Sequence, residues 1–262
     1  MRVGLRDEYW SGGRMTKDAT STRQQGKVKR AHMISRGYLQ PWGDSRKQVD
    51  VIDVEKRRGF TTGVVNATVV NYAYDPSLLT HDLEDQFQKI ESRGIPALVK
   101  LRYGHRLETE EKTSVVSFLD MHLDRGRYAD QAQVSTSALV LKTGGRMEHE
   151  NLNLGDRFLL SQSLKDVTRL SSMKLESLPW KVHEAEGLVT GDGAVMLWRK
   201  SAGSRIVAVT FPMSPNKLLV IGNDFVPLIS EHLNDLMTRK CRRWIVGARG
   251  SLNLGWATSD DY

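Results

Sequence analysis

His32 is the residue whose type and position point most directly to chemistry. It lies in "KRAHMISRGYLQPWG", directly after the cations Lys29 and Arg30. An imidazole takes and returns a proton near neutral pH, which suits general acid or base catalysis. The adjacent positive charges favour the neutral ring, so we expect His32 to act as a base. The alternative is that its ring hydrogen-bonds a backbone carbonyl and anchors the start of the domain.

Two glutamates in "LEDQFQKIES" form a second candidate. Glu84 and Glu91 are seven residues apart. On a helix they would share one face, about 10.5 Å apart along the axis. A carboxylate beside Leu83 and Phe87 requires a partner if it points inward. We therefore expect Glu84 to be the site residue and Glu91 to lie on a solvated face with ordinary ion pairs.

Asp192 and Asn234 complete the polar candidates. Asp192 lies between glycines in "TGDG", a pattern typical of a plain hairpin turn. The functional alternative is that the glycines let a ligand approach the backbone while Asp192 binds a cation, a hydroxyl or an arginine. Asn234 shares a predicted helix with Arg242 and Arg243, and could orient a buried network or contact a phosphate. Arginines near the end of a helix also simply complement its dipole.

Cysteine and histidine usage indicates neither a disulfide nor a structural metal site. The chain has a single cysteine, Cys241, which cannot form an internal disulfide. The histidines other than His32 lack metal-ligand spacing. The sequence therefore leaves any cofactor or metal undefined.

Net charge and hydropathy limit the classes of partner that this protein can have. The 262 residues carry a net charge of +7, which favours binding to polyanions such as RNA or DNA. No 18 apolar residues run together, so no membrane-spanning helix is predicted, and the N-terminus lacks the apolar stretch of a signal peptide. We expect a cytoplasmic protein with nucleic acid as its partner; its oligomeric state is undefined.

The chain divides into a tail and one domain. Residues 1–28 have no helical or strand period, so we expect a flexible basic N-terminal tail. Met15 is an alternative start to Met1. Residues 29–262 are expected to form a single α+β domain.

The hydrophobic periodicity along this domain changes twice, from strand to helix and back to strand. Two strands flank Lys56–Gly59, and a helix over residues 83–101 is expected to kink at Gly94–Pro96. Thr109 is the expected cap of a second helix. Residues 187–222 read as three strands and residues 229–245 as a closing helix. This order predicts a mostly antiparallel sheet packed with a central group of helices.

Several of these stretches resemble one known family. "HMISRGYLQPWG" resembles the opening His-x-hydrophobic-Pro-x-x-Tyr-Leu-x-x-Phe signature of the bacterial family called domain of unknown function 4238. Ser35 replaces the signature proline and Trp42 its aromatic residue. Further similarity runs in order through residues 29–250, and its matching positions are His32, Tyr38, Leu39, Glu84, Glu91, Asp192, Phe211–Pro215, Asn234 and Arg243. The resemblance implies candidate residues and no reaction.

Three functions agree with these observations. The first is a nucleic-acid-binding protein, a nuclease for RNA or DNA in a defence or toxin-like setting. Its predicted catalytic residues are His32, Glu84 and Asp192, and its predicted substrate-binding residues are Arg36, Tyr38, Asn234 and Arg243. The second is an enzyme acting on a small phosphorylated or nucleotide-like metabolite. The third is a non-catalytic binding module.

Overall fold

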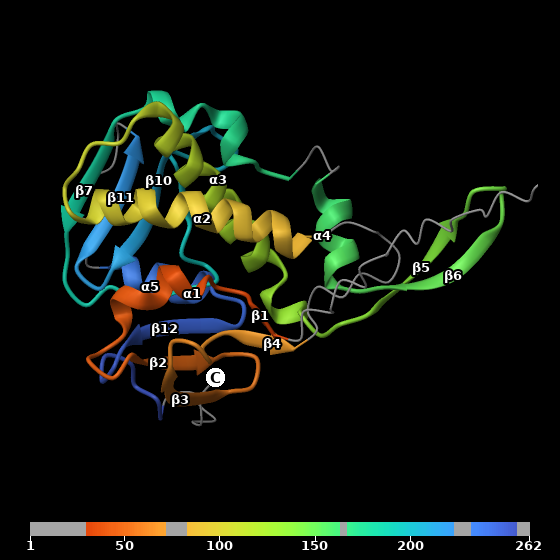
Figure 1. The fold of residues 1–262 in the computed structure, drawn as a ribbon, viewed down its shortest axis with the longest axis horizontal. Helices are drawn as coiled ribbons and strands as arrows, with labels where there is room; N and C mark the ends of the chain where they lie inside the picture. Colours follow the sequence, from red (N-terminus) through yellow and green to blue (C-terminus); the bar gives the residue numbers. More distant parts are fainter. Residues whose placement is uncertain (1–29, 72–82, 163–166, 223–231, 256–262) are drawn as a thin grey trace, which may run out of the picture.

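The computed structural model describes residues 30–71, 83–162, 167–222 and 232–255 (Figure 1). Helices and antiparallel strands form one α+β domain, which confirms the predicted fold class. The predicted tail of residues 1–28, with its choice between Met1 and Met15, lies outside the described residues. Within the described ranges, no helix is both long and apolar enough to cross a bilayer.

The last third of the chain builds one four-stranded antiparallel sheet. Its strand order is β7 (Trp180–Glu184), β11 (Lys217–Gly222), β10 (Ile206–Ser214) and β9 (Met196–Arg199). β10 and β11 are the central strands, and nearly all of their residues are buried. Their continuous apolar runs are therefore typical of strands covered on both faces. The strands predicted within 206–222 are confirmed.

A second four-stranded sheet joins the two ends of the domain. Its order is β3 (Arg58–Gly63), β2 (Gln48–Asp53), β12 (Trp244–Ala248) and β8 (Thr190–Gly191). The predicted strand pair around Lys56–Gly59 is confirmed as the β2–β3 hairpin. The chain between residues 187 and 199, predicted as one strand, is divided into β8 and β9.

The predicted closing helix is too long. The helix α5 spans only Leu233–Lys240, and Ile245 lies in β12 instead. The spacing of Met237, Cys241 and Ile245 suits a helix, but the short apolar run from Trp244 suits a buried strand equally well. Pairing with β2 and β8 on either side decides the conformation in favour of the strand.

Two long helices, α2 (Leu83–Arg102) and α3 (Thr109–Arg127), pack against each other beside the first sheet (Figure 1). α2 continues through Pro96 as one helix. A Cβ on Gly94 would lie 2.6 Å from the Cβ of Phe118, so glycine allows the two helices to approach closely.

The N-terminus of α3 differs by one residue from its predicted position. Glu108, not Thr109, is the cap. The Glu108 side chain accepts a hydrogen bond from the backbone of Glu111, and the Glu111 side chain accepts one from the backbone of Glu108. This reciprocal capping box satisfies two backbone donors that the helix itself cannot.

The remaining elements are short. A two-stranded pair, β1 (Arg30–His32) with β4 (Val69–Asn71), carries His32. A hairpin of β5 (Thr136–Leu141) and β6 (Met147–Leu152) projects from the body of the domain (Figure 1). The other described helices are α1 (Arg36–Leu39), α4 (Leu154–Gln162) and the 3-10 turns Gln40–Trp42, Ala129–Gln131, Leu170–Met173 and Leu175–Ser177.

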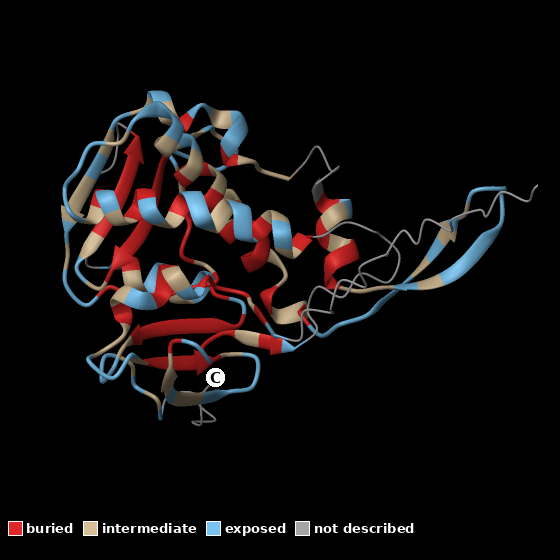
Figure 2. Ribbon diagram, viewed as in Figure 1, coloured by how far each residue is buried: buried red, intermediate tan, exposed pale blue. Residues whose placement is uncertain are grey.

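An aromatic cluster lies at the centre of the core, where the two sheets and the helices meet. Tyr38, Trp42, Phe118, His122 and Phe211 are all buried. The ring centre of Tyr38 lies 4.7 Å from that of Phe211 and 5.2 Å from that of Trp42. Figure 2 shows the buried residues concentrated along the strands of both sheets and the inner faces of α2 and α3.

Candidate functional site

His32 lies at the end of β1 and is half-buried. Its Nε2 lies 3.2 Å from the carbonyl oxygen of Val65. Burial lowers the pKa of His32; the Val65 hydrogen bond and the charge of Glu91 oppose this, while Arg36 and Arg30 add to it. Because a carbonyl can only accept, Nε2 carries a proton, and in the neutral ring Nδ1 keeps its lone pair. The lowered pKa agrees in direction with the neutral imidazole expected from the sequence, and the Val65 contact is the carbonyl hydrogen bond of the anchoring alternative.

Glu91 is the carboxylate that interacts electrostatically with His32. Its Oε1 lies 2.7 Å from Nη1 of Arg125, whose guanidinium is buried and stands 4.4 Å from the ring centre of Phe87. Glu91 thus forms the expected kind of ion pair, but with a buried cation on α3, and its own side chain is 26% exposed. Glu84, in the first turn of α2, is half-buried.

Asp192 is buried and holds the backbone that leads into β12. Its carboxylate accepts hydrogen bonds from the backbone N–H groups of Arg242, Arg243 and Trp244, at 2.8, 3.2 and 2.8 Å. Burial raises the pKa of Asp192 to about 6, while these N–H groups act to lower it. Its carbonyl oxygen would lie 2.1 Å from a Cβ on Gly126, so α3 packs tightly against this turn. These contacts assign Asp192 a structural role, and its catalytic role stays a prediction.

Asn234 and Arg243 also make contacts within the domain. Asn234 accepts a hydrogen bond from the backbone of Val189 and donates one to the carbonyl of Gly187. The Arg243 side chain is only 4% exposed and its Nε lies 3.0 Å from a carboxylate oxygen of Glu55. Asn234 therefore holds the backbone segment of residues 187–189, and Arg243 is enclosed by its own chain. Substrate binding by either residue stays a prediction.

Arg36 and Tyr38 differ sharply in access to solvent. Arg36 begins α1 and is exposed beside His32. Tyr38 is fully buried; its hydroxyl donates to the carbonyl of Pro212 and lies 2.6 Å from the Thr190 hydroxyl. Of this pair of predicted substrate-binding residues, only Arg36 is placed where a ligand can reach it.

The three predicted catalytic side chains do not form one hydrogen-bonded group. Among the described residues, no hydrogen bond or ion pair links any two of His32, Glu84 and Asp192. The same ranges contain no group of three or more His, Cys, Asp or Glu side chains placed to hold a metal ion. Of the predicted site residues, Arg36 is exposed, His32, Glu84 and Asn234 are half-buried, and the other three are buried.

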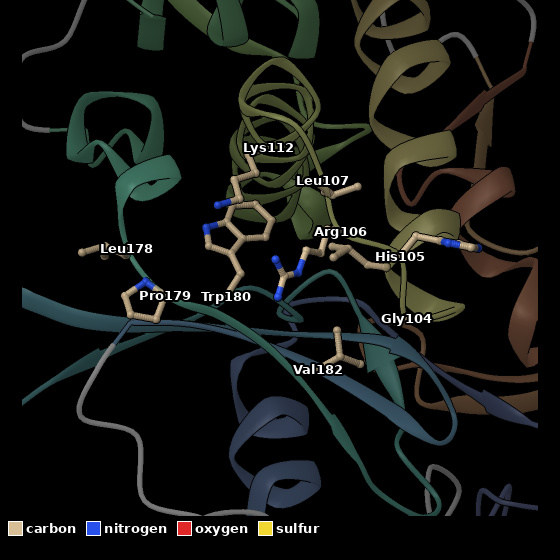
Figure 3. A pocket seen from close by; sticks show the side chains of 10 residues that line it. Gly104, His105, Arg106, Leu107, Lys112, Leu178, Pro179, Trp180 and Val182 are labelled. Carbon is tan, nitrogen blue, oxygen red and sulfur yellow. The ribbon is translucent and has the colours of Figure 1, made fainter.

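A pocket that sequence reasoning missed lies at the connection between α2 and α3 (Figure 3). It has a volume of about 400 Å³, and its polar lining consists of His105, Arg106, Lys112 and Trp180. The first three come from the α2–α3 region and Trp180 begins β7. No local spacing brings these two segments together, because the sheet determines which residues face the helix connection. The local sequence offers only the adjacent pair His105 and Arg106 in the connection after α2.

Acid should destabilise the protein through His122. This ring is buried, donates from Nε2 to the carbonyl of Gly191 at 2.9 Å, and has a pKa that burial lowers to about 4, with Arg125 contributing and the hydrogen bond opposing. Between pH 6.5 and 4 the unfolded chain binds this proton and the folded chain does not. The free energy of unfolding should therefore fall with decreasing pH, by at most about 1.4 kcal/mol per pH unit for this group.

Urea unfolding of wild type and His122→Gln across this range measures the effect. The difference in stability between the two should shrink as the pH falls, with His149→Gln, at an exposed position, as the control. Asp192 changes the stability with pH in the opposite direction, because its folded pKa is raised. All three proteins contain Asp192, so its contribution cancels in the comparison. A parallel pH dependence in wild type and His122→Gln would contradict the prediction.

The described residues define an α+β protein with two antiparallel four-stranded sheets, a pair of long helices and a half-buried histidine next to an exposed arginine. Residues 30–251 match the family described as "Protein of unknown function (DUF4238)", and the chain belongs to this family. The resemblance predicted from the opening motif is thereby confirmed. Searches of curated proteins and of solved structures found no match.

Proposed function

We propose that this protein binds nucleic acid and cleaves a phosphodiester bond with His32 as the general base. The observation that supports this most strongly is the hydrogen bond that orients the imidazole. The Val65 carbonyl occupies Nε2, which leaves Nδ1 without a hydrogen-bond partner among the described residues, and burial lowers the pKa, which favours the neutral ring. A general base that works near neutral pH requires this protonation state.

The charges around His32 suit a phosphate. Arg36 and Arg30 are exposed and act on the imidazole electrostatically. Arg30 is oriented by a 2.8 Å hydrogen bond to the side chain of Asn66. Guanidinium groups bind phosphate oxygens in a bidentate manner, and the net charge of +7 adds attraction to any polyanion. The negative charge of Glu91 is balanced by Arg125 and so repels a phosphate less.

The proposed step conserves protons and electron pairs. Nδ1 of His32 accepts the proton of a water or ribose hydroxyl as its oxygen attacks phosphorus. The new P–O bond forms while the P–O bond to the leaving oxygen breaks. The imidazolium then gives this proton to the leaving oxygen, directly or through a water molecule, which restores the neutral ring of His32.

His32→Gln tests this step, since glutamine keeps a donor for the Val65 carbonyl but does not titrate. Cleavage of single-stranded RNA and DNA should fall by about 10²- to 10⁴-fold, which is the usual contribution of a general base. The melting temperature and the gel-shift affinity should stay close to wild type. His149→Gln, the same change at an exposed histidine of the β5–β6 hairpin, should leave activity unchanged.

Two outcomes would contradict the proposal. A loss of about 1–3 kcal/mol in stability, with activity following the folded fraction, would show that His32 is only an anchor. Absence of gel shift for both RNA and DNA at about 50 mM salt, where phosphate contacts are strongest, would remove nucleic acid as the partner.

A further inference from the structure

The pocket between the α2–α3 connection and β7 is lined by basic side chains. Arg106 and His105 are exposed at its rim, and Lys112 projects into it from the first turns of α3. None of the described residues that line the pocket is acidic. Nor does any described residue form an ion pair with Arg106, His105 or Lys112. A concave surface of one charge sign attracts and concentrates ligands of the opposite sign.

The nearest acidic residue in sequence does not neutralise this charge. Glu111, the neighbour of Lys112, pairs with Lys100 and accepts the backbone N–H of Glu108. Both contacts lower its pKa, with the Lys100 hydrogen bond the larger cause. Glu111 therefore holds the start of α3 and does not pair with Lys112, whose Nζ lies 3.4 Å from the carbonyl oxygen of Glu176 and has no carboxylate partner among the described residues.

Trp180 gives the pocket a flat aromatic wall in a fixed orientation. Its Nε1 donates to the carbonyl of Leu175 at 2.9 Å, and Nζ of Lys112 stands 5.7 Å from its ring centre. Figure 3 shows Lys112 and Arg106 reaching toward the indole from different sides. Leu107 and Val182 add apolar lining. Trp180 is half-buried, and planar heterocycles stack favourably on the accessible face of an aromatic ring.

We propose that this pocket binds a nucleotide, with the base stacked on Trp180 and the phosphate between Arg106 and Lys112. Cations alone would suit any anion, and an indole alone would suit any flat ring; a nucleotide carries both groups at adjacent positions. The volume of about 400 Å³ lies within the range typical of small-ligand pockets. The same chemistry is offered by a free nucleotide and by the phosphorylated end of a nucleic acid strand.

This binding site does not depend on the chemistry proposed for His32. His32 interacts with Glu91 on α2, whereas the pocket begins at Leu101, ten residues further along the same helix. That separation is about 15 Å along the helix axis. A nucleotide in the pocket and a phosphodiester at His32 would therefore contact different residues.

Calorimetry on the full chain tests the site with ADP, adenosine and inorganic phosphate as probes. ADP should bind at least about tenfold more tightly than adenosine or phosphate, because it uses both the ring and the charges. Arg106→Ala and Lys112→Ala should each weaken ADP binding by about 10-fold or more, the usual loss for one charged hydrogen bond. Lys56→Ala removes an equal charge from the exposed β2–β3 turn and should change affinity by less than about twofold.

The ring contact requires its own variant. Trp180→Leu should weaken ADP binding while leaving the weak binding of phosphate unchanged, and a melting curve verifies that this variant is folded. If Trp180→Leu is unfolded, quenching of indole fluorescence by ADP but not by phosphate in wild type replaces it. Equal affinity for ADP and phosphate, or no binding of ADP at about 1 mM, would overturn the proposal.

A 5′-phosphorylated ten-residue oligonucleotide identifies the natural source. Tighter binding of this strand than of ADP, weakened by Arg106→Ala, assigns the pocket to a strand end; binding of ADP alone assigns it to a free nucleotide. His32→Gln should bind ADP like wild type in either case. The experiments therefore distinguish a failure of the nucleotide-binding proposal from a failure of the His32 proposal.

Discussion

Asp192→Ala is expected to lower the free energy of unfolding by about 3 kcal/mol or more. The carboxylate accepts three backbone hydrogen bonds at the start of β12, and alanine leaves these N–H groups without acceptors. A buried polar group that loses its partner costs about 1–3 kcal/mol. The loss should be large because β12 is a central strand of its sheet, paired on both sides.

Chemical denaturation of Asp192→Ala, Asp192→Asn and Asp130→Ala measures this effect. Asparagine keeps one acceptor oxygen and should give an intermediate loss. Asp130→Ala removes the partly exposed partner of Arg242 and should cost less than about 1 kcal/mol. A fully stable Asp192→Asn that loses all cleavage activity would instead favour the catalytic role predicted for Asp192 from the sequence.

Tyr38→Ala is expected to destabilise the protein by about 3–5 kcal/mol, the usual cost of removing a large buried aromatic side chain. Its ring contacts Trp42, Phe118, His122 and Phe211, so alanine would leave a cavity where both sheets meet the helices. Its hydroxyl also donates to the Pro212 carbonyl, and burial raises its pKa, so it stays protonated.

Tyr38→Phe separates the two contributions, since it keeps the ring and removes only the hydroxyl. It should cost about 1–3 kcal/mol, because the buried carbonyl of Pro212 and the Thr190 hydroxyl lose their partner. Tyr103→Ala, at an aromatic residue 78% exposed, is the control and should be nearly neutral. Normal stability of Tyr38→Phe combined with weakened nucleic-acid binding would support the substrate role predicted for Tyr38.

The local pattern of apolar residues was sufficient to predict the helices that bury one face and the strands that form one continuous apolar run. The stripe through Leu83, Phe87 and Leu98 predicted α2, and the β-branched residues around Val49 and Val51 predicted β2. These signals are local because the period of a helix or strand is repeated within a few residues. The family signature around His32 and Tyr38 is also contained in one short stretch of sequence.

Pairings between distant segments decided the rest. The predicted closing helix was extended to Ile245 because this residue continues the helical spacing of Met237 and Cys241, and only pairing with β2 and β8 places Ile245 in a strand. The pairing of Glu91 with Arg125 was not predicted, because Arg125 lies on a different helix and no sequence spacing links the two residues.

The sequence by itself determined the α+β class, the family, the two long helices and the strands within residues 48–63 and 206–222. Tertiary structure alone decided which polar residues are accessible. It buried Tyr38, Asp192 and Arg243 among contacts with their own chain, and it left Arg36 exposed beside His32. It also brought Arg106 and Lys112 to Trp180, because a binding surface depends on distances between segments that have no period in common.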